Sequence, residues 1–112
     1  AYELAAKCKL QKPEYRETAL GICEFALKSM RADGRIGKSW RNDGKAVDGE
    51  GTIGAFLIKP LVTAYRAVHK APYLEGAERA YAYYIREFMK NGFTTAGALD
   101  TDCIDKESAG NF

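Results

Sequence analysis

Apolar residues recur along this chain with the period of an α-helix. Between Tyr15 and Met30 they stand at positions i, i+4, i+7, i+8, i+11 and i+15, and charged residues occupy the opposite face. Pro13 suits the first turn of such a helix, and Gly34 supplies an ending in which glycine takes the left-handed conformation. The pattern predicts an amphipathic helix over residues 13–32.

Two further helices follow from the same reasoning. Residues 52–68 are apolar on nearly all sides, which is typical of a buried helix, and Pro60 should kink it or else lie where its missing N–H is tolerated. Residues 73–90 combine an apolar face with a charged one, so we expect a surface helix. Residues 35–51 contain four glycines and are expected to form a long irregular loop. No stretch shows the strict alternation of a half-buried strand.

The pattern also repeats. Tyr15-Arg-Glu-Thr-Ala matches Tyr73-Leu-Glu-Gly-Ala at an offset of 58 residues (73 − 15), and the glycine that ends each helix recurs at the same offset. One unit is an amphipathic outer helix, a glycine-rich loop, an apolar inner helix and a short Pro-containing turn. Incomplete helices over 1–10 and 105–112 flank about two such units. We therefore expect one all-α domain over residues 1–112, built from antiparallel helical hairpins.

Composition narrows the function classes. Lys and Arg number 17 against 15 Asp and Glu, and no basic block occurs, so the charge falls short of what a nucleic-acid-binding surface requires. The longest apolar run, from Ile53 to Ile58, is too short to cross a membrane, and we expect a soluble protein, cytoplasmic or exported. A length of 112 residues accommodates one modest core.

The cysteines and the histidine give no sign of a metal site. Cys8, Cys23 and Cys103 include no C-x-x-C pair that would indicate zinc or redox chemistry. Cys23 falls on an apolar helical face and is expected to be a buried thiol. His69 has no second histidine with which to hold a metal ion, and we expect neither a metal nor an organic cofactor.

Acidic residues concentrate in two glycine-rich loops that precede the inner helices. Asp48 and Glu50 form one D-x-E pair, and Asp105 and Glu107 form another. Two more acids, Asp100 and Asp102, precede the second pair. A helix N-terminus favours a carboxylate as a cap, so each of these residues has a structural interpretation. Four acids in one short loop nevertheless exceed what capping requires.

Three stretches carry a resemblance to a known family. They are Asp48-Gly-Glu-Gly-Thr-Ile-Gly-Ala-Phe-Leu at an inner-helix start, Pro72-Tyr-Leu-Glu-Gly-Ala at an outer-helix start, and Gly97-Ala-Leu-Asp-Thr-Asp-Cys-Ile-Asp-Lys-Glu-Ser-Ala. Together with the alternation of outer and inner helices, they resemble the (α/α)6 toroid of six-hairpin glycosidases. Such a toroid closes with six hairpins and this chain supplies about two. The resemblance therefore implies a fragment of a larger toroid, or an assembly with copies of itself or with another chain.

The resemblance implies carbohydrate as the substrate and glycoside hydrolysis by two carboxylates as the reaction. Within one D-x-E the two side chains point to different sides of a helix, so the pair should come from two loops. One such pair would be Asp48 or Glu50 with Asp105 or Glu107, and the alternative is a pair that includes a residue outside this chain. The candidate substrate contacts are Trp40, Asp100 and Asp102. A sugar epimerase or lyase is an alternative on the same toroid.

Several structural alternatives remain open. Trp40 is either a sugar-stacking platform or a plug that packs its loop onto the helices. The chain is either part of an enzyme or a non-catalytic helical-repeat module that binds another protein, and the concentration of acids at one end favours the enzyme. Because two hairpins leave the apolar inner helix few neighbours, we expect the isolated chain to self-associate.

Overall fold

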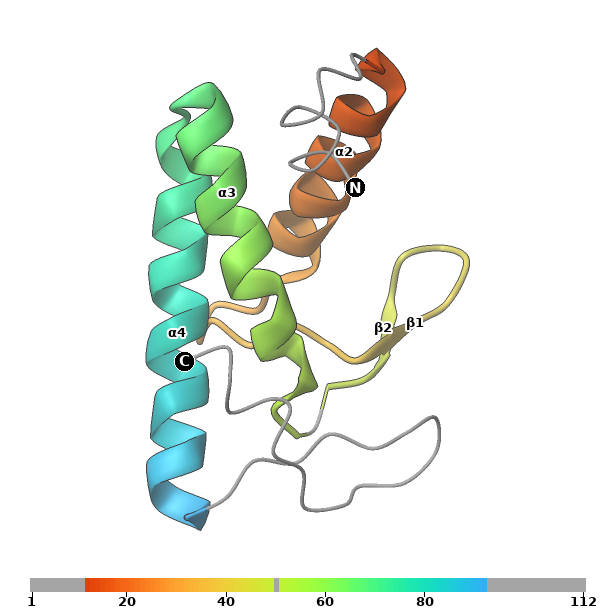
Figure 1. Cartoon of the computed structure of the whole chain (residues 1–112). Coiled ribbons are helices and arrows are strands. Elements are labelled where there is room, and N and C mark those ends of the chain that lie inside the picture. Colours follow the sequence, from red (N-terminus) through yellow and green to blue (C-terminus); the bar gives the residue numbers. More distant parts are fainter. Residues whose placement is uncertain (1–11, 50, 93–112) are drawn as a thin grey trace.

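Three α-helices of alternating direction make up most of the described chain (Figure 1). The computed structural model describes residues 12–49 and 51–92. Helices α2 (Pro13–Ser29) and α4 (Ala71–Asn91) run in one direction, and α3 (Ile58–Val68) runs opposite to both. The segment between α2 and α3 holds strands β1 (Ser39–Trp40) and β2 (Ala46–Asp48) and the 3-10 helix η1 (Ile53–Leu57). The predicted mostly helical fold is confirmed for these residues.

The sequence repeat reappears in the way the chain enters α2 and α4. The two helices begin at residues 13 and 71, an offset of 58 (71 − 13), which is the offset of the repeat. Lys12 (φ −116°, ψ 102°) and Lys70 (φ −91°, ψ 118°) are the extended residues before them, and each helix has a proline in its first two positions. Proline is suited to this place because its missing N–H would have no helical partner there.

Helices α3 and α4 form a tight antiparallel hairpin. Only His69 and Lys70 separate them, and His69 closes α3 in the left-handed conformation (φ 54°) with its N–H donated to the carbonyl of Tyr65 (2.7 Å). The hairpin buries one face of each helix in the core, where Leu61 and Ala80 are fully enclosed. Burying a leucine side chain completely contributes about 1.5–3 kcal/mol, so this face anchors α3 to its neighbour.

Helix α2 packs against the first half of α4. A Cβ atom added at Gly76 would lie 2.2 Å from Cδ2 of Leu27, so a larger residue there would require the Leu27 side chain to move. Nearby, the hydroxyl of Tyr73 donates a hydrogen bond of 2.5 Å to the Glu24 carboxylate. This bond raises the pKa of Tyr73 to about 12, because the neutral hydroxyl is the form that can donate.

The structure corrects two details of the predicted elements. Residues 52–68 do not form one helix, since η1 precedes α3, and Pro60 lies in the first turn of α3, where its missing N–H is tolerated. The prediction that residues 35–51 are irregular is wrong, because they contain the antiparallel pair β1–β2. The helices predicted over 1–10 and 105–112 lie outside the described residues.

Gly34 and Gly92 both have a positive φ, but they differ in the space around them. Alanine substitutions at the two positions therefore separate the cost of backbone strain from the cost of steric overlap. A Cβ at Gly34 (φ +96°) would lie 2.2 Å from the carbonyl oxygen of Arg79 in α4, whereas a Cβ at Gly92 (φ +73°) would meet no atom of the described residues within 4 Å. Gly92→Ala should therefore cost only the strain of a left-handed alanine, about 1 kcal/mol. Gly34→Ala should cost about 1–3 kcal/mol more, because α4 must move. Urea unfolding measures both variants, and equal losses would contradict the predicted overlap.

The hydrogen bond between Tyr73 and Glu24 predicts a loss of stability in alkali. Tyrosine has a usual pKa of 10.0, and the folded value for Tyr73 is about 12, so the folded state holds this proton more tightly than the unfolded state. The stabilisation is fully present below pH 10 and is lost as the pH rises through 12. Between these values the free energy of unfolding should fall less steeply for Tyr73→Phe and for Glu24→Gln than for the unsubstituted chain. Identical slopes in pH-dependent urea titrations would exclude the bond as a source of stability.

Candidate functional site

The end of the bundle at which α2 and α4 finish is the candidate site. The segment 30–57 connects α2 to α3 at this end, while the short turn from α3 to α4 lies at the opposite end (Figure 1). Strand β2, which contains Asp48, belongs to this segment. The described part of the predicted site therefore lies where the long connection runs.

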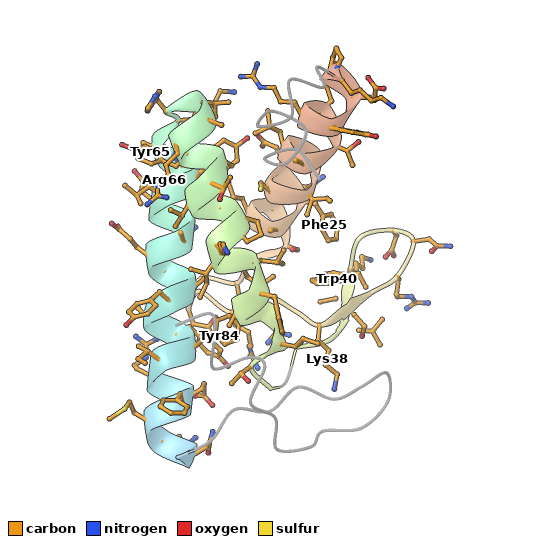
Figure 2. The ribbon with its side chains drawn as sticks, in the orientation of Figure 1. Phe25, Lys38, Trp40, Tyr65, Arg66 and Tyr84 are labelled. Carbon is orange, nitrogen blue, oxygen red and sulfur yellow. The ribbon has the colours of Figure 1, made fainter. Side chains whose placement is uncertain are left out.

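Tyr84 fixes this segment to α4 (Figure 2). Its side chain is fully buried, and its hydroxyl donates to the carbonyl oxygen of Ile36 (2.5 Å) and accepts from the N–H of the same residue (3.0 Å). Ile36 is itself buried, so the tyrosine satisfies both backbone polar groups of a residue that water cannot reach. Burial raises the pKa of Tyr84, and its hydroxyl therefore remains a donor.

Gly34 and Gly54 allow the connecting segment to lie close to α4, near the hydrogen bonds between Tyr84 and Ile36. A Cβ at Gly54, in η1, would lie 2.0 Å from the Tyr84 hydroxyl oxygen and 2.5 Å from the Ile36 carbonyl oxygen. Gly34 makes the close approach to α4 described above, and the Asp33 carboxylate accepts from the N–H of Arg35 across this turn (3.0 Å). Both ends of the segment therefore reach α4, one at each glycine.

Strands β1 and β2 form a small hairpin within the segment that Tyr84 attaches to α4. The N–H of Arg41 donates to the carbonyl of Lys45 (2.9 Å), and Gly44 (φ +81°) closes the three-residue loop between them. Ser39 lies opposite Asp48, and a register irregularity separates this pair from the next. The sequence did contain the signal, since Asp43-Gly44 between extended residues is typical of a hairpin turn.

Trp40 packs the hairpin onto α2. Its ring meets Phe25 edge to face, with centroids 5.4 Å apart and ring planes at 75° (Figure 2). Trp40 is half-buried at the edge of the core, which supports the plug interpretation. Its indole N–H is buried without a hydrogen-bond acceptor among residues 12–49 and 51–92. Stacking of Trp40 on a sugar stays a prediction.

The structure places one of the predicted acids. The backbone of Asp48 lies in β2 at the candidate end of the bundle. Five others lie outside the described residues: Glu50, Asp100, Asp102, Asp105 and Glu107. The proposed pairing of carboxylates from two loops therefore stays a prediction.

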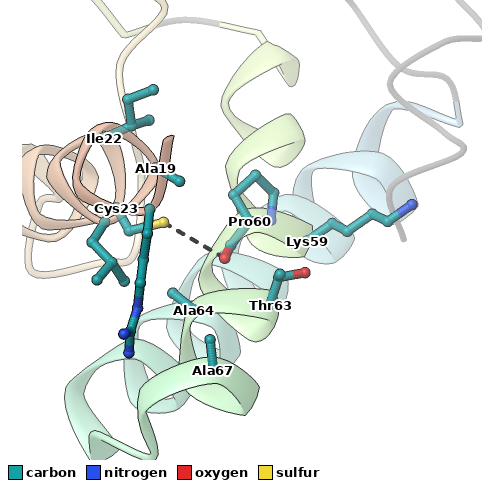
Figure 3. Close-up of a pocket in the computed structure, with 10 residues that line it drawn as sticks. Ala19, Ile22, Cys23, Lys59, Pro60, Thr63, Ala64 and Ala67 are labelled. Atoms are coloured by element: carbon teal, nitrogen blue, oxygen red, sulfur yellow. Dashed lines mark hydrogen bonds between the residues drawn. The ribbon is translucent and has the colours of Figure 1, made fainter. Parts of the chain in front are cut away.

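A groove of about 330 Å³ between α2 and α3 was missed by the sequence reasoning (Figure 3). Ala19 and Ile22 line one wall, and Pro60, Thr63 and Ala67 line the other. Arg16 and Lys59 are its charged members. Small residues on both helices gave the only hint, because short side chains leave space between helices without changing the helical pattern.

Cys23 lies on the α2 wall of this groove. Its side chain is buried, as predicted, and its thiol contacts the carbonyl oxygen of Pro60 at 3.5 Å (Figure 3). Burial, and to a lesser extent the charge of Glu24, raises the pKa of this thiol above its usual value. The thiol is therefore held in its unreactive neutral form and acts as a small apolar group.

Comparisons with known proteins add no assignment. No family model, curated protein or solved structure matches this chain. In the part of the chain that the structure describes, no three His, Cys, Asp or Glu side chains are grouped to hold a metal ion. None of the described helices combines the length and apolar character needed to span a membrane.

The hydrogen bonds between Tyr84 and Ile36 predict that removing the Tyr84 hydroxyl will strongly lower the stability of the fold. Tyr84→Phe leaves the N–H and C=O of Ile36 buried without their partner, and each unsatisfied group costs about 1–3 kcal/mol. Urea unfolding should therefore show a loss of about 2 kcal/mol or more. Tyr81→Phe is the matched control, since Tyr81 lies on the same helix with 45% of its surface exposed, and it should change stability by less than about 0.5 kcal/mol. A loss for Tyr84→Phe no larger than the control would show that the bond contributes nothing.

Proposed function

We propose that this chain is part of a carbohydrate-processing enzyme of the helical-toroid type. In this proposal α2 and α4 are outer helices, α3 is an inner helix, and the reaction is hydrolysis of a glycosidic bond. The two catalytic carboxyl groups come from the two D-x-E stretches. One is Asp48 or Glu50, and the other is Asp105 or Glu107.

The alternation of connections is the observation that supports this proposal best. A two-residue turn joins α3 to α4 at one end, and a long glycine-rich segment joins α2 to α3 at the other. Helices α2 and α4 run the same way, and the segment leaves α2 level with the middle of α4, on the side toward which α4 also runs (Figure 1). One D-x-E stretch follows each of these two helices in the sequence. Two loops that leave one end of a bundle are able to bring two carboxylates to one substrate.

The chemistry requires two carboxyl groups on opposite sides of the scissile bond. One protonates the leaving oxygen, and the other attacks the sugar directly or activates water. A separation of about 5–5.5 Å would indicate retention of configuration, and about 6.5–9.5 Å would indicate inversion. Asp100, Asp102 and Trp40 are proposed to contact the sugar, and the mechanism needs no cofactor.

A non-catalytic helical-repeat module is the second candidate. The observation that favours it is the apolar groove between α2 and α3, because helical repeats bind partners through surfaces formed by neighbouring helices. The two candidates differ in what they require of the acidic loops. Only the enzyme depends on their carboxylates.

Asp105→Asn in the complete encoded protein separates these two functions. Asparagine is also a good helix cap, so the substitution keeps the structural role of Asp105 and removes only its acid–base function. If Asp105 is catalytic, hydrolysis of the accepted glycoside should fall about 10²–10⁴-fold, with stability changed by less than about 1 kcal/mol.

Asp43→Asn provides the matched control for this assay. Asp43 lies in the hairpin turn, where its carboxylate accepts from the N–H of Lys45 (3.0 Å), and asparagine retains an oxygen for that bond. Activity should therefore be unchanged. Hydrolysis that survives Asp105→Asn within a few-fold would reduce Asp105 to a cap, and absence of hydrolysis on every glycoside tested would favour the interaction module.

A further inference from the structure

The groove between α2 and α3 is an apolar surface that lacks a cover in the part of the chain that the structure describes. Ile22, on its α2 wall, has 51% of its surface exposed. The small side chains of Ala19, Thr63 and Ala67 leave room for an additional element (Figure 3). Covering this groove would remove apolar surface from water, which favours association with a matching surface.

The charged residues of the groove are basic. Arg16 on α2 and Lys59 on α3 are both exposed, and no acidic residue is among the described residues that line the groove. A surface of complementary charge is therefore an apolar ridge that carries a carboxylate. The α2 wall from Arg16 to Cys23 covers seven steps of the helix (23 − 16), or about 10 Å, so about two helical turns would fill its length.

Helix α4 presents such a ridge on the side away from α2. Leu74, Tyr81 and Ile85 recur at i, i+7 and i+11 and share one helical face, which we term the α4 stripe. Tyr81 has 45% of its surface exposed, and the other two residues are half-buried. Ile85 follows Gly76 by nine residues (85 − 76), or about two and a half turns, so the stripe faces away from the side on which Gly76 meets Leu27 of α2.

Glu78 supplies the carboxylate. It is exposed, and it follows Leu74 by four residues and precedes Tyr81 by three, so it lies beside both on the helix surface. From Leu74 to Tyr81 the stripe also covers seven steps of the helix (81 − 74), or about 10 Å. The stripe therefore matches the groove in length and apolar character, and its charge is opposite.

We propose that the groove binds the α4 stripe of a second copy of this chain, with Glu78 facing the cations of the groove. Pairing of like surfaces is disfavoured. Groove against groove would bring Arg16 and Lys59 together with their own copies, and stripe against stripe would do the same with Glu78. The contact is therefore head-to-tail. Because α4 contributes no described residue to the groove, each copy uses both surfaces at once, and the contact continues into a ring or a chain of copies.

Mixing two variants of the 112-residue chain tests this proposal. Ile22→Arg blocks the groove and Tyr81→Arg blocks the stripe, and circular dichroism checks that both variants keep the helical fold. In sedimentation, the unsubstituted chain should form dimers and larger species as its concentration rises, whereas each variant alone should stay monomeric. An equal mixture of the two variants should form dimers and nothing larger, because one intact groove and one intact stripe remain.

Val47→Arg is the matched control for these variants. Val47 lies in β2, outside both surfaces, with 67% of its side chain exposed, and its substitution should leave association unchanged. A monomeric unsubstituted chain would mean that a different occupant fills the groove, and the proposal would be wrong. It would also be wrong if either variant dimerised alone, which would indicate pairing of like surfaces, or if the mixture stayed monomeric.

Reversal of one charge provides a second measurement that leaves the apolar contacts in place. Glu78→Lys should raise the dissociation constant between copies about tenfold, because a cation then faces the cations of the groove. Glu17→Lys makes the same change at an exposed acid of α2 that does not line the groove, and it should leave the constant unchanged. Equal effects of the two substitutions would overturn the proposal. These measurements concern association alone, so they are independent of whether the complete protein hydrolyses a glycoside.

Discussion

The connecting segment depends on one constraint. The backbone N–H and C=O of Ile36 are buried, and both must be hydrogen-bonded. A chain that crosses the core without regular secondary structure must still find partners for its N–H and C=O groups, and here one hydroxyl supplies both. That hydroxyl belongs to Tyr84, the last buried residue on the α4 face that packs in the core. The glycine at position 54 leaves the space that the bond needs. The candidate site is thus positioned by the same helix face that forms the core.

The connections between helices at the two ends of the bundle differ in how tightly their geometry is fixed. At one end two residues join α3 to α4, and the backbone of His69 and a first-turn proline fix the geometry. At the other end a long segment is attached at a few points, each requiring a close contact. Loops attached to a rigid scaffold in this way are the usual location of binding and catalytic residues. The proposed function uses this end of the bundle.

The helices could be predicted from sequence because their signals are local. Pro13 and Pro72 mark the starts of α2 and α4, and Gly92 marks the end of α4, at the predicted places within three residues. The starts of α2 and α4 also keep the offset of the repeat. Of the predicted acids, Asp48 alone lies among the described residues, so the chemistry of the site stays a hypothesis.

Other features could not be predicted from the sequence, because they depend on contacts between residues that lie far apart in the chain. Tyr84 looks like any apolar-face tyrosine in its helix, and only the fold brings it to Ile36, 48 residues away. The contact between Trp40 and Phe25 is of the same kind. The hairpin at 39–48 differs from these cases. Its strands are too short to show alternation, and Asp43-Gly44 is the turn signal that marks it in the sequence.

The two-residue turn between α3 and α4 has a consequence for how this chain can change in length. Extra residues there would displace α3 along α4 and separate the small side chains that pack between them. The tip of the hairpin at 42–44 is exposed, and its ends are already joined by the bond from Arg41 to Lys45. Lengthening such a loop twofold costs only about 0.6 kcal/mol in closure entropy. Insertions should therefore accumulate at the hairpin, next to the candidate site, so that the surface facing a ligand can diversify while the helical frame keeps its dimensions.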